Sequence, residues 1–311
     1  MRKYFVTGFY LLIVGGILLL GGFLMGANRS VVWNHGFKVA QNVDETYPLE
    51  KFDNIYLDGR SANVNVRFGD RYKIHVDGDK SQAPTYKVKD GTLTVSANKQ
   101  KNHIGVNFFG RESVTITIPM NKSLDNISIN LADSNIHIND VTVSHLMKTA
   151  KDLDYDANLY LNDVTIKKLN KANFYNATFS TKNSKISDMT LSASDYSDFK
   201  ADNTTFTRSN INLDESNLSL QESNLDSMNA LINHGKVAIS KSTLMNQNKF
   251  KLFNSGRFSG SSIMVDGMKL STDRGIVRYF GKNYGNNYQN KIDSTNLLDV
   301  KAADKGLITI K

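Results

Sequence analysis

A short pattern of apolar and polar residues recurs along the middle of the chain and constrains its fold more than any other feature. Each copy alternates apolar and polar positions, inserts two or three polar residues, and returns to an apolar one. The copies at 134–143 and 157–166 are offset by 23 residues, and 187–191 resembles their second half after 25 more. Such a period is the length of one coil of a β-solenoid, in which each coil buries its apolar row against its neighbours. Weaker copies follow at 199–206, 218–225, 237–244 and 263–270.

The residues before these copies also alternate with a period of two. Between 51 and 131 several short apolar–polar runs are separated by turn signals, among them Asp-Gly pairs at 58, 77 and 90. No stretch from 51 to 277 carries a sustained helical pattern with caps. The sequence therefore predicts an all-β domain, a β-solenoid or β-helix-like stack of short strand repeats. Two architectures remain open: one continuous β-helix, which we favour, or a β-rich part at 51–131 that leads into it.

Asn and Ser residues recur between the apolar positions of the copies. Asn tolerates the left-handed backbone conformation, and both side chains can bond nearby backbone groups. We therefore expect these residues at the corners between strands, and we expect ladders of stacked Asn side chains.

The N-terminal segment is uncharged and almost wholly apolar from Tyr4 to Ala27. At 1.5 Å per residue, a helix over 4–27 would cross a hydrocarbon core of about 30 Å. Arg2 and Lys3 precede it, and the positive-inside rule then keeps residues 1–3 in the cytoplasm and everything after the helix outside. A cleaved signal peptide is the alternative, but its apolar region should be shorter, and Met25 occupies a position where cleavage requires a small residue.

These features predict the following organisation of the chain. A cytoplasmic tail (1–3) and a transmembrane helix (4–27) are followed by a stalk (28–50) that lacks sustained periodicity. An extracytoplasmic β-strand-repeat domain covers 51–311, with leading strands at 51–131, the clearest repeats at 132–270, and a loop with a capping strand at 271–311. The expected location is the cell membrane, crossed once, with the C-terminal domain outside the cell.

Charge is distributed unevenly along the exported part. Residues 123–235 hold nine Lys/Arg and fifteen Asp/Glu, whereas 236–311 hold thirteen and five, within a net charge of +8 for the chain. A basic end outside the membrane favours anionic partners such as lipid headgroups or wall polymers, and its location argues against nucleic acid. The chain has no cysteine, which excludes disulfides, thiolate metal sites and a cysteine nucleophile.

One acidic segment imitates a calcium-binding loop. Asp152, Asp154 and Asp156 alternate, and Asp163 stands at the twelfth position. However, position six holds Ala157 instead of the turn-forming Gly, position twelve is not Glu, and the flanking pattern is that of strands. We interpret the three alternating acids as an outward-facing row on a strand, and we predict neither a metal site nor a cofactor.

A second candidate site lies near the C-terminus, where aromatic and basic residues are interleaved in a segment of loop-like composition. Such residues stack on sugars or sit at membrane interfaces, so this segment is a candidate ligand-binding loop. A strand at 307–310 follows it and is expected to hold it down. The candidate residues are Arg278, Tyr279, Phe280, Lys282, Tyr284, Tyr288 and Lys291.

The rhythm of the strands resembles a known bacterial family of adhesin-like β-strand-repeat proteins, domain of unknown function 4097. The resemblance rests on the segments 52–55, 63–66, 86–95, 114–119 and 127–131, and it extends over most of 51–270. It implies a β-strand-repeat domain of a bacterial envelope protein, membrane-associated in many members, with some members linked to sensing of envelope stress. The resemblance implies no catalytic residue.

Three functions therefore remain open. The first is a non-enzymatic, adhesin-like or envelope interaction module that binds a cell-wall polymer or a protein. The second is an extracytoplasmic sensor of cell-envelope stress, which would need a membrane-protein partner because residues 1–3 are too few to signal. The third is a β-helix enzyme acting on polysaccharides, which we rank last because no paired carboxylates, histidine pair or nucleophile motif stands out.

Overall fold

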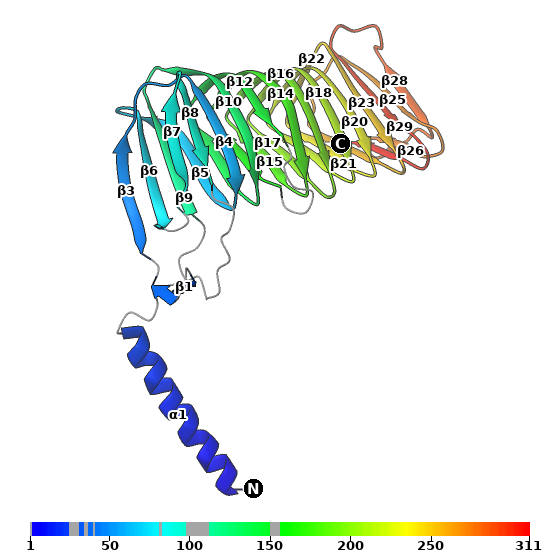
Figure 1. Cartoon of the computed structure of the whole chain (residues 1–311). Coiled ribbons are helices and arrows are strands. Elements are labelled where there is room, and N and C mark those ends of the chain that lie inside the picture. The colour runs from blue at the N-terminus through cyan, green and yellow to red at the C-terminus, as the bar shows by residue number, and fades with distance from the viewer. Residues whose placement is uncertain are drawn as a thin grey trace.

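The computed structural model describes residues 2–24, 31–33, 37–39, 41–80, 83–97, 112–149 and 156–311. It consists of one N-terminal helix, α1 (Arg2–Leu24), and a long stack of β-strands in which the chain advances from one end to the other (Figure 1). Within the described residues, none of the helical structure combines the length and the apolar character that a membrane crossing requires.

The strands fall into three groups along the chain. The first group comprises β1 (Val31–Trp33), β2 (Phe37–Val39), β3 (Asn42–Pro48), β4 (Asn54–Arg60), β5 (Ala62–Gly69), β6 (Lys73–Asp79), β7 (Thr85–Lys89), β8 (Thr92–Ser96) and β9 (Glu112–Pro119). The second comprises β10 (Ser123–Ala132), β11 (Asn135–Asn139), β12 (Thr142–Lys148), β13 (Asn158–Asn162), β14 (Thr165–Tyr175), β15 (Thr178–Lys182), β16 (Lys185–Ser194), β17 (Asp198–Asp202), β18 (Thr205–Asp214), β19 (Asn217–Gln221), β20 (Asn224–Asn233), β21 (Lys236–Ser240), β22 (Thr243–Met245), β23 (Gln247–Phe253) and β24 (Arg257–Ser261). The third comprises β25 (Gly267–Thr272), β26 (Ile276–Tyr279), β27 (Lys282–Asn283), β28 (Asn287–Asn290), β29 (Leu297–Ala302) and β30 (Leu307–Ile310).

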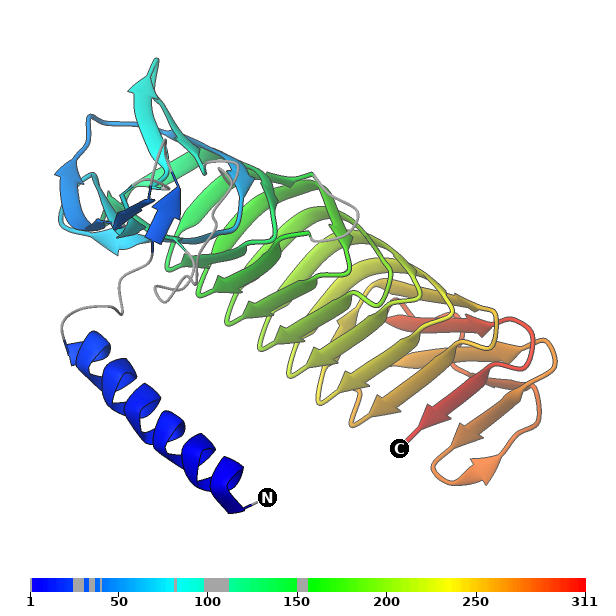
Figure 2. The ribbon, with the colours of Figure 1, turned by 60° about the horizontal axis from the view of Figure 1, so that its bottom comes forward.

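The strands form a β-solenoid, as the repeats predict. Each central coil gives one long strand to a first sheet, which we call the long-strand sheet, and one five-residue strand to a second, the short-strand sheet (Figure 2). Both sheets run from one end of the stack to the other, which confirms the single continuous architecture. The strongest repeat is also confirmed, because Asn135 pairs with Asn158 across 23 residues. The 25-residue offset of the third copy is wrong: Ile166 pairs with Ile186.

The corners of the coils adopt the left-handed conformation, and they align in columns. Asn183 and Asn203 have φ of 49° and 46° at equivalent corners, which confirms the expected role of Asn. Charged residues also occupy corners, where they can pair with the equivalent corner of the preceding coil: Arg208 donates to Asp188 at 2.6 Å. The three columns are Asp163, Asn183, Asn203, Glu222, Lys241 and Ser262; Asp188, Arg208, Ser227 and Asn246; and Asn176, Asp195, Glu215, His234 and Asn254.

Stacked polar side chains connect the coils. The expected Asn ladder is present, since Asn158 donates to Asn135 at 2.9 Å and Asn135 to Asn63 at 3.1 Å. A buried hydroxyl ladder follows one corner column, in which the Ser223 and Ser242 hydroxyls each donate to a carbonyl two residues back and accept an N–H from the preceding coil. These bonds satisfy backbone groups that the turning chain would leave buried and unpaired.

Apolar side chains line the interior of the solenoid from one end to the other. Inward positions alternate with outward ones on either side of the corner within β18 and β20, and phenylalanines stack on one another in the core. Phe179 and Phe199 are in register and pack edge to face with ring centroids 4.8 Å apart. Because each fully buried side chain of this size contributes roughly 1.5–3 kcal/mol, stacking of these rows stabilises the coils.

At the N-terminal end, the folded body begins earlier than expected. Strand β3 lies within the segment predicted to be a stalk, yet it pairs with β6 over seven residues, from Asn42 to Pro48. Residues 42–48 therefore belong to the body. The coil formed by β8 and β9 lies outside the coil formed by β4 and β5, although it comes later in the chain, and the antiparallel strands β7, β6 and β3 close this end.

At the C-terminal end, the order of the coils is again exchanged. Strand β29 lies between β23 and β25, and β30 lies between β24 and β26. In Figure 2 the red C-terminal strand accordingly runs inside the stack. The strand at 307–310 is therefore not the cap that the sequence suggested. The short antiparallel strands β27 and β28 form the edges at this end, and short edge strands offer little surface for unwanted pairing.

Candidate functional site

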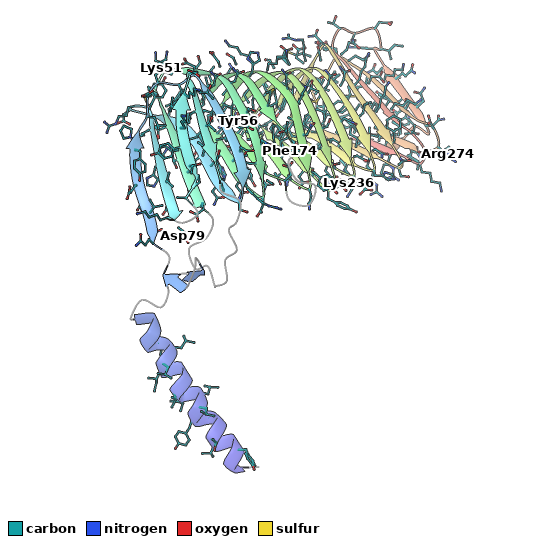
Figure 3. All side chains as sticks on the ribbon, viewed as in Figure 1. Lys51, Tyr56, Asp79, Phe174, Lys236 and Arg274 are labelled. Carbon is teal, nitrogen blue, oxygen red and sulfur yellow. The ribbon has the colours of Figure 1, made fainter. Side chains whose placement is uncertain are left out.

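The aromatic and basic residues near the C-terminus gather at the outer end of the solenoid. Figure 3 marks the two ends by Asp79 at one and Arg274 at the other. The segment predicted to be a loop is strand: β26 and β27 form a hairpin, and β28 pairs antiparallel with β25. We call the group of Tyr279, Phe280, Lys282, Tyr284 and Tyr288 the aromatic end.

The side chains of the aromatic end contact one another directly. The rings of Tyr279 and Tyr288 stack with centroids 4.2 Å apart, and the Tyr284 ring meets Tyr288 edge-on at 4.8 Å. The Lys282 ammonium lies 5.1 Å from the centroid of the Tyr284 ring, within the range of a cation–π interaction. Burial, followed by a hydrogen bond with Tyr279, raises the pKa of Tyr288 to about 12, so its phenol stays neutral at physiological pH.

Phe280 occupies the tip of the β26–β27 hairpin in an unfavourable conformation. The two-residue turn Phe280–Gly281 has φ of 47° and 77°, and a turn with both φ positive favours Asn-Gly. A bulky residue in the left-handed region is a genuine outlier, and such strain persists where it serves a role. The Phe280 side chain is also 67% exposed, so it is available to a partner instead of the core.

Two of the predicted residues do not join this group. Arg278 is exposed on β26, in register with Thr309 and Asn283. Lys291 adopts a left-handed corner, where its carbonyl accepts the N–H of Ser294. In the described residues neither side chain has a ring contact or an ion pair with the aromatic end.

The calcium hypothesis concerned four acids, of which Asp152 and Asp154 lie outside the described residues. Asp163 sits at a left-handed corner. Asp156 is buried, which corrects the interpretation of an outward-facing acid row. Over the described ranges, no three His, Cys, Asp or Glu residues are grouped so as to hold a metal ion.

Asp156 forms a buried ion pair that the sequence analysis missed. Its carboxylate accepts from the Lys148 ammonium at 2.5 Å and from the N–H groups of Ala157 and Tyr175. Both charged side chains are fully buried, and Lys148 also lies over the Phe174 ring. Burial lowers the pKa of Lys148 and raises that of Asp156. The signal was available, because Lys148 is in phase with the inward-facing Leu146.

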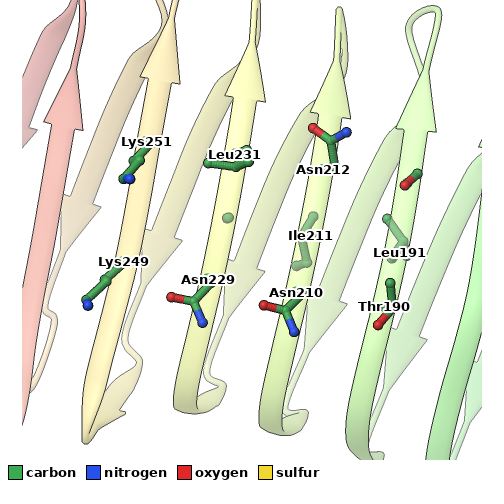
Figure 4. A pocket seen from close by; sticks show the side chains of 11 residues that line it. Thr190, Leu191, Asn210, Ile211, Asn212, Asn229, Leu231, Lys249 and Lys251 are labelled. Carbon is green, nitrogen blue, oxygen red and sulfur yellow. The ribbon is translucent and has the colours of Figure 1, made fainter.

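A shallow depression of about 290 Å³ lies on the outer face of the long-strand sheet, and we call it the sheet groove (Figure 4). It crosses β16, β18, β20 and β23, whose outward side chains form two rows along the solenoid. The sequence analysis did not find it, because the rows exist only once the coils are in register. The rows are Thr190, Asn210, Asn229 and Lys249, and Ser192, Asn212, Leu231 and Lys251.

The stacked coils, with a groove along one sheet and an aromatic end, define a non-globular β-solenoid repeat protein. A profile of the family described as Toastrack DUF4097 matches residues 52–261, about two thirds of the chain. The chain belongs to this family, which confirms the resemblance noted from its strand rhythm.

Solved bacterial structures are similar to this chain at low sequence identity, and one of them, with a TM-score of 0.56, shares its fold. A "putative lipid binding protein" from Parabacteroides distasonis ATCC 8503 is 12% identical, with a TM-score of 0.56 over 87% of this chain and 97% of that one. A "putative adhesin" from the same organism is 10% identical, with a TM-score of 0.49 over the same shares of the two chains. A "putative adhesin" from Bacteroides fragilis NCTC 9343 is 14% identical, with a TM-score of 0.47, again over 87% and 97%. No curated protein matches the chain.

Proposed function

We propose that this protein is a non-enzymatic, membrane-tethered cell-surface protein that acts as an adhesin-like or envelope interaction module. The observation that carries the proposal is the aromatic end, where Phe280 is exposed in a conformation that costs stability. An exposed side chain that is held in a conformation opposing folding is best explained by binding. The basic character of residues 236–311 supports an anionic wall polymer or lipid headgroup as the partner.

The tether is proposed from the surface of α1. The helix exposes large apolar side chains, with Leu11, Leu12 and Leu19 between 68% and 73% exposed. Such a surface needs an apolar environment, because monomeric soluble proteins rarely expose large apolar patches. We infer a membrane as that environment, with residues 1–3 in the cytoplasm and the solenoid outside. Carbonate extraction of membranes and external protease on intact cells test the two points separately. Release by carbonate would refute the tether, and shielding from protease would refute the external location of the solenoid.

The binding role is tested with a substitution that separates binding from folding. In Phe280→Asn the turn becomes Asn-Gly, which suits its positive φ values, so we expect unchanged or higher stability together with weaker binding to isolated cell walls. Ile292→Asn is the matched control, since it makes the same apolar-to-Asn change at an exposed position just after β28, outside the aromatic end, and leaves the charge unaltered. If F280N binds walls as tightly as the unaltered full chain, Phe280 does not carry the function.

A further inference from the structure

The polar side chains of the sheet groove differ from the stacked polar side chains elsewhere on the protein. Several such neighbours outside the groove bond to each other: Asn233 donates to Asp214 at 2.7 Å and Asn254 donates to Asn233 at 2.5 Å. Asn210 and Asn229 are likewise neighbours in register, yet among the described residues their side chains make no hydrogen bond. Figure 4 shows both amides pointing out of the sheet. Their donors and acceptors are therefore available to a ligand.

The same groove has a positive end. Lys249 and Lys251 both line it, and neither forms an ion pair within the described part of the chain. The rows continue onto β29, where Lys301 follows Lys251 and Asp299 follows Lys249. The Lys301 ammonium is 3.7 Å from the Asp273 carboxylate and is therefore already paired. Of these three lysines, Lys249 and Lys251 are the two that can pair with an anionic ligand.

The direction of the groove favours an extended ligand. The rows run across the strands, so equivalent side chains repeat about every 4.8 Å along the solenoid, close to the length of one sugar unit in an extended glycan. A second depression of about 240 Å³ adjoins the first at Ser192 and Asn212 and continues it to β14. Within the second row, the Leu231 side chain is 46% exposed and offers an apolar surface on which the C–H face of a sugar can pack.

We propose that the sheet groove binds an extended anionic glycan whose chain runs along the solenoid axis. The Asn210 and Asn229 amides bond sugar hydroxyls on successive units, Leu231 packs against a ring face, and Lys249 and Lys251 pair with carboxylates or other anionic substituents. The proposal deepens the proposed function by naming a ligand class, but it places that ligand on the sheet and not at the aromatic end.

Binding of the full chain to defined glycans tests the proposal. The probes are polygalacturonate, alginate and hyaluronate as linear anionic glycans, cellohexaose as a neutral linear one, and phosphatidylglycerol vesicles as an anionic surface without sugar polymer. The variants are Lys249→Glu/Lys251→Glu, which reverses the charge of the groove, and Asn210→Leu/Asn229→Leu, which removes the amides and keeps outward strand positions. Lys185→Glu/Lys236→Glu is the matched control, with the same change in net charge at exposed positions outside the groove.

We expect at least one anionic glycan to bind, with affinity lowered tenfold or more by each groove variant and at most twofold by the control. The proposal is overturned if none of the three anionic glycans binds, if cellohexaose or the vesicles bind as tightly, or if the control loses as much as the groove variants. The F280N variant should bind these glycans normally. If the unaltered full chain binds isolated cell walls but none of the anionic glycans, only the groove proposal fails. If the unaltered full chain binds no cell walls, the proposed function fails.

Discussion

The exchanged order of the last coils leads to a specific prediction about the C-terminal residues. Strands β29 and β30 come last in the chain, but they pair on both sides, β29 through six residue pairs with β23 and six with β25. They therefore connect the outermost coil, β25 and β26, to the rest of the solenoid. Deleting 297–311 should release this outer coil as well as the deleted strands.

The magnitude follows from what the deletion exposes. Four large aliphatic side chains of β29 and β30 are at most 2% exposed, and at roughly 1.5–3 kcal/mol each they represent about 6–12 kcal/mol of apolar burial. Residual compactness of the unfolded chain lowers this value by about 10–40%. The outer coil keeps only its hairpin partners β27 and β28, and an isolated hairpin is marginally stable at best. The four side chains are Leu298, Val300, Ile308 and Ile310.

Hydrogen exchange measured by mass spectrometry on the full chain and the truncated chain checks this prediction. We expect amides at 267–290 to lose protection, whereas those at 123–233 keep it, because coils in a solenoid interact mainly with their neighbours. Val300→Asp should have the same effect without truncation, since Val300 lies between Phe250 and Leu270. Lys301→Asn, at the adjacent exposed position, is the control, because it introduces a polar side chain without placing an acid beside Asp273 of the outer coil. Retained protection at 267–279 in the truncated chain would refute the reasoning.

Two further predictions concern buried charge. Lys148→Met and Asp156→Asn should each lower the free energy of unfolding by about 3–5 kcal/mol, because each leaves the other buried charge without its partner. In urea unfolding, the double variant should lose less than the sum of the two single losses. Strictly additive losses would contradict this prediction. Burial, with the charges of Asp79 and Asp77, raises the pKa of the half-buried Glu112 carboxyl to about 7, so the folded state binds its proton more tightly than the unfolded state. Stability from this group is therefore present below about pH 4.5 and is lost as the pH rises towards 7. Glu112→Gln should raise the free energy of unfolding at pH 8 by on the order of 1 kcal/mol, after allowance for solvent screening, and leave it unchanged at pH 4. An equal gain at both pH values would contradict the raised pKa of Glu112.

The candidate sites show where local patterns reach their limit. The interleaved residues at 278–291 predicted a binding segment, and five of the seven gather at one end of the solenoid. Their loop-like composition concealed three short strands, because the Asn, Gly and Tyr residues here lie in short antiparallel hairpins at the edges of the two sheets. The alternating acids misled for a related reason. Asp156 follows the phase of an exposed row, but its partner Lys148 lies eight residues away and draws it into the core.

The sequence by itself determined the all-β class, the approximate coil length and the Asn corners, because these depend on alternation and turn preferences within some twenty residues. Only the tertiary structure decided which coil lies beside which at the two ends, where β8–β9 and β29–β30 are stacked out of chain order. It also decided which outward side chains form a groove and which buried charges meet. These features depend on parallel neighbours that are distant in the chain, and the apolar alternation of one strand fits any inward-facing neighbour equally well. Register and coil order are therefore settled by packing of the whole stack.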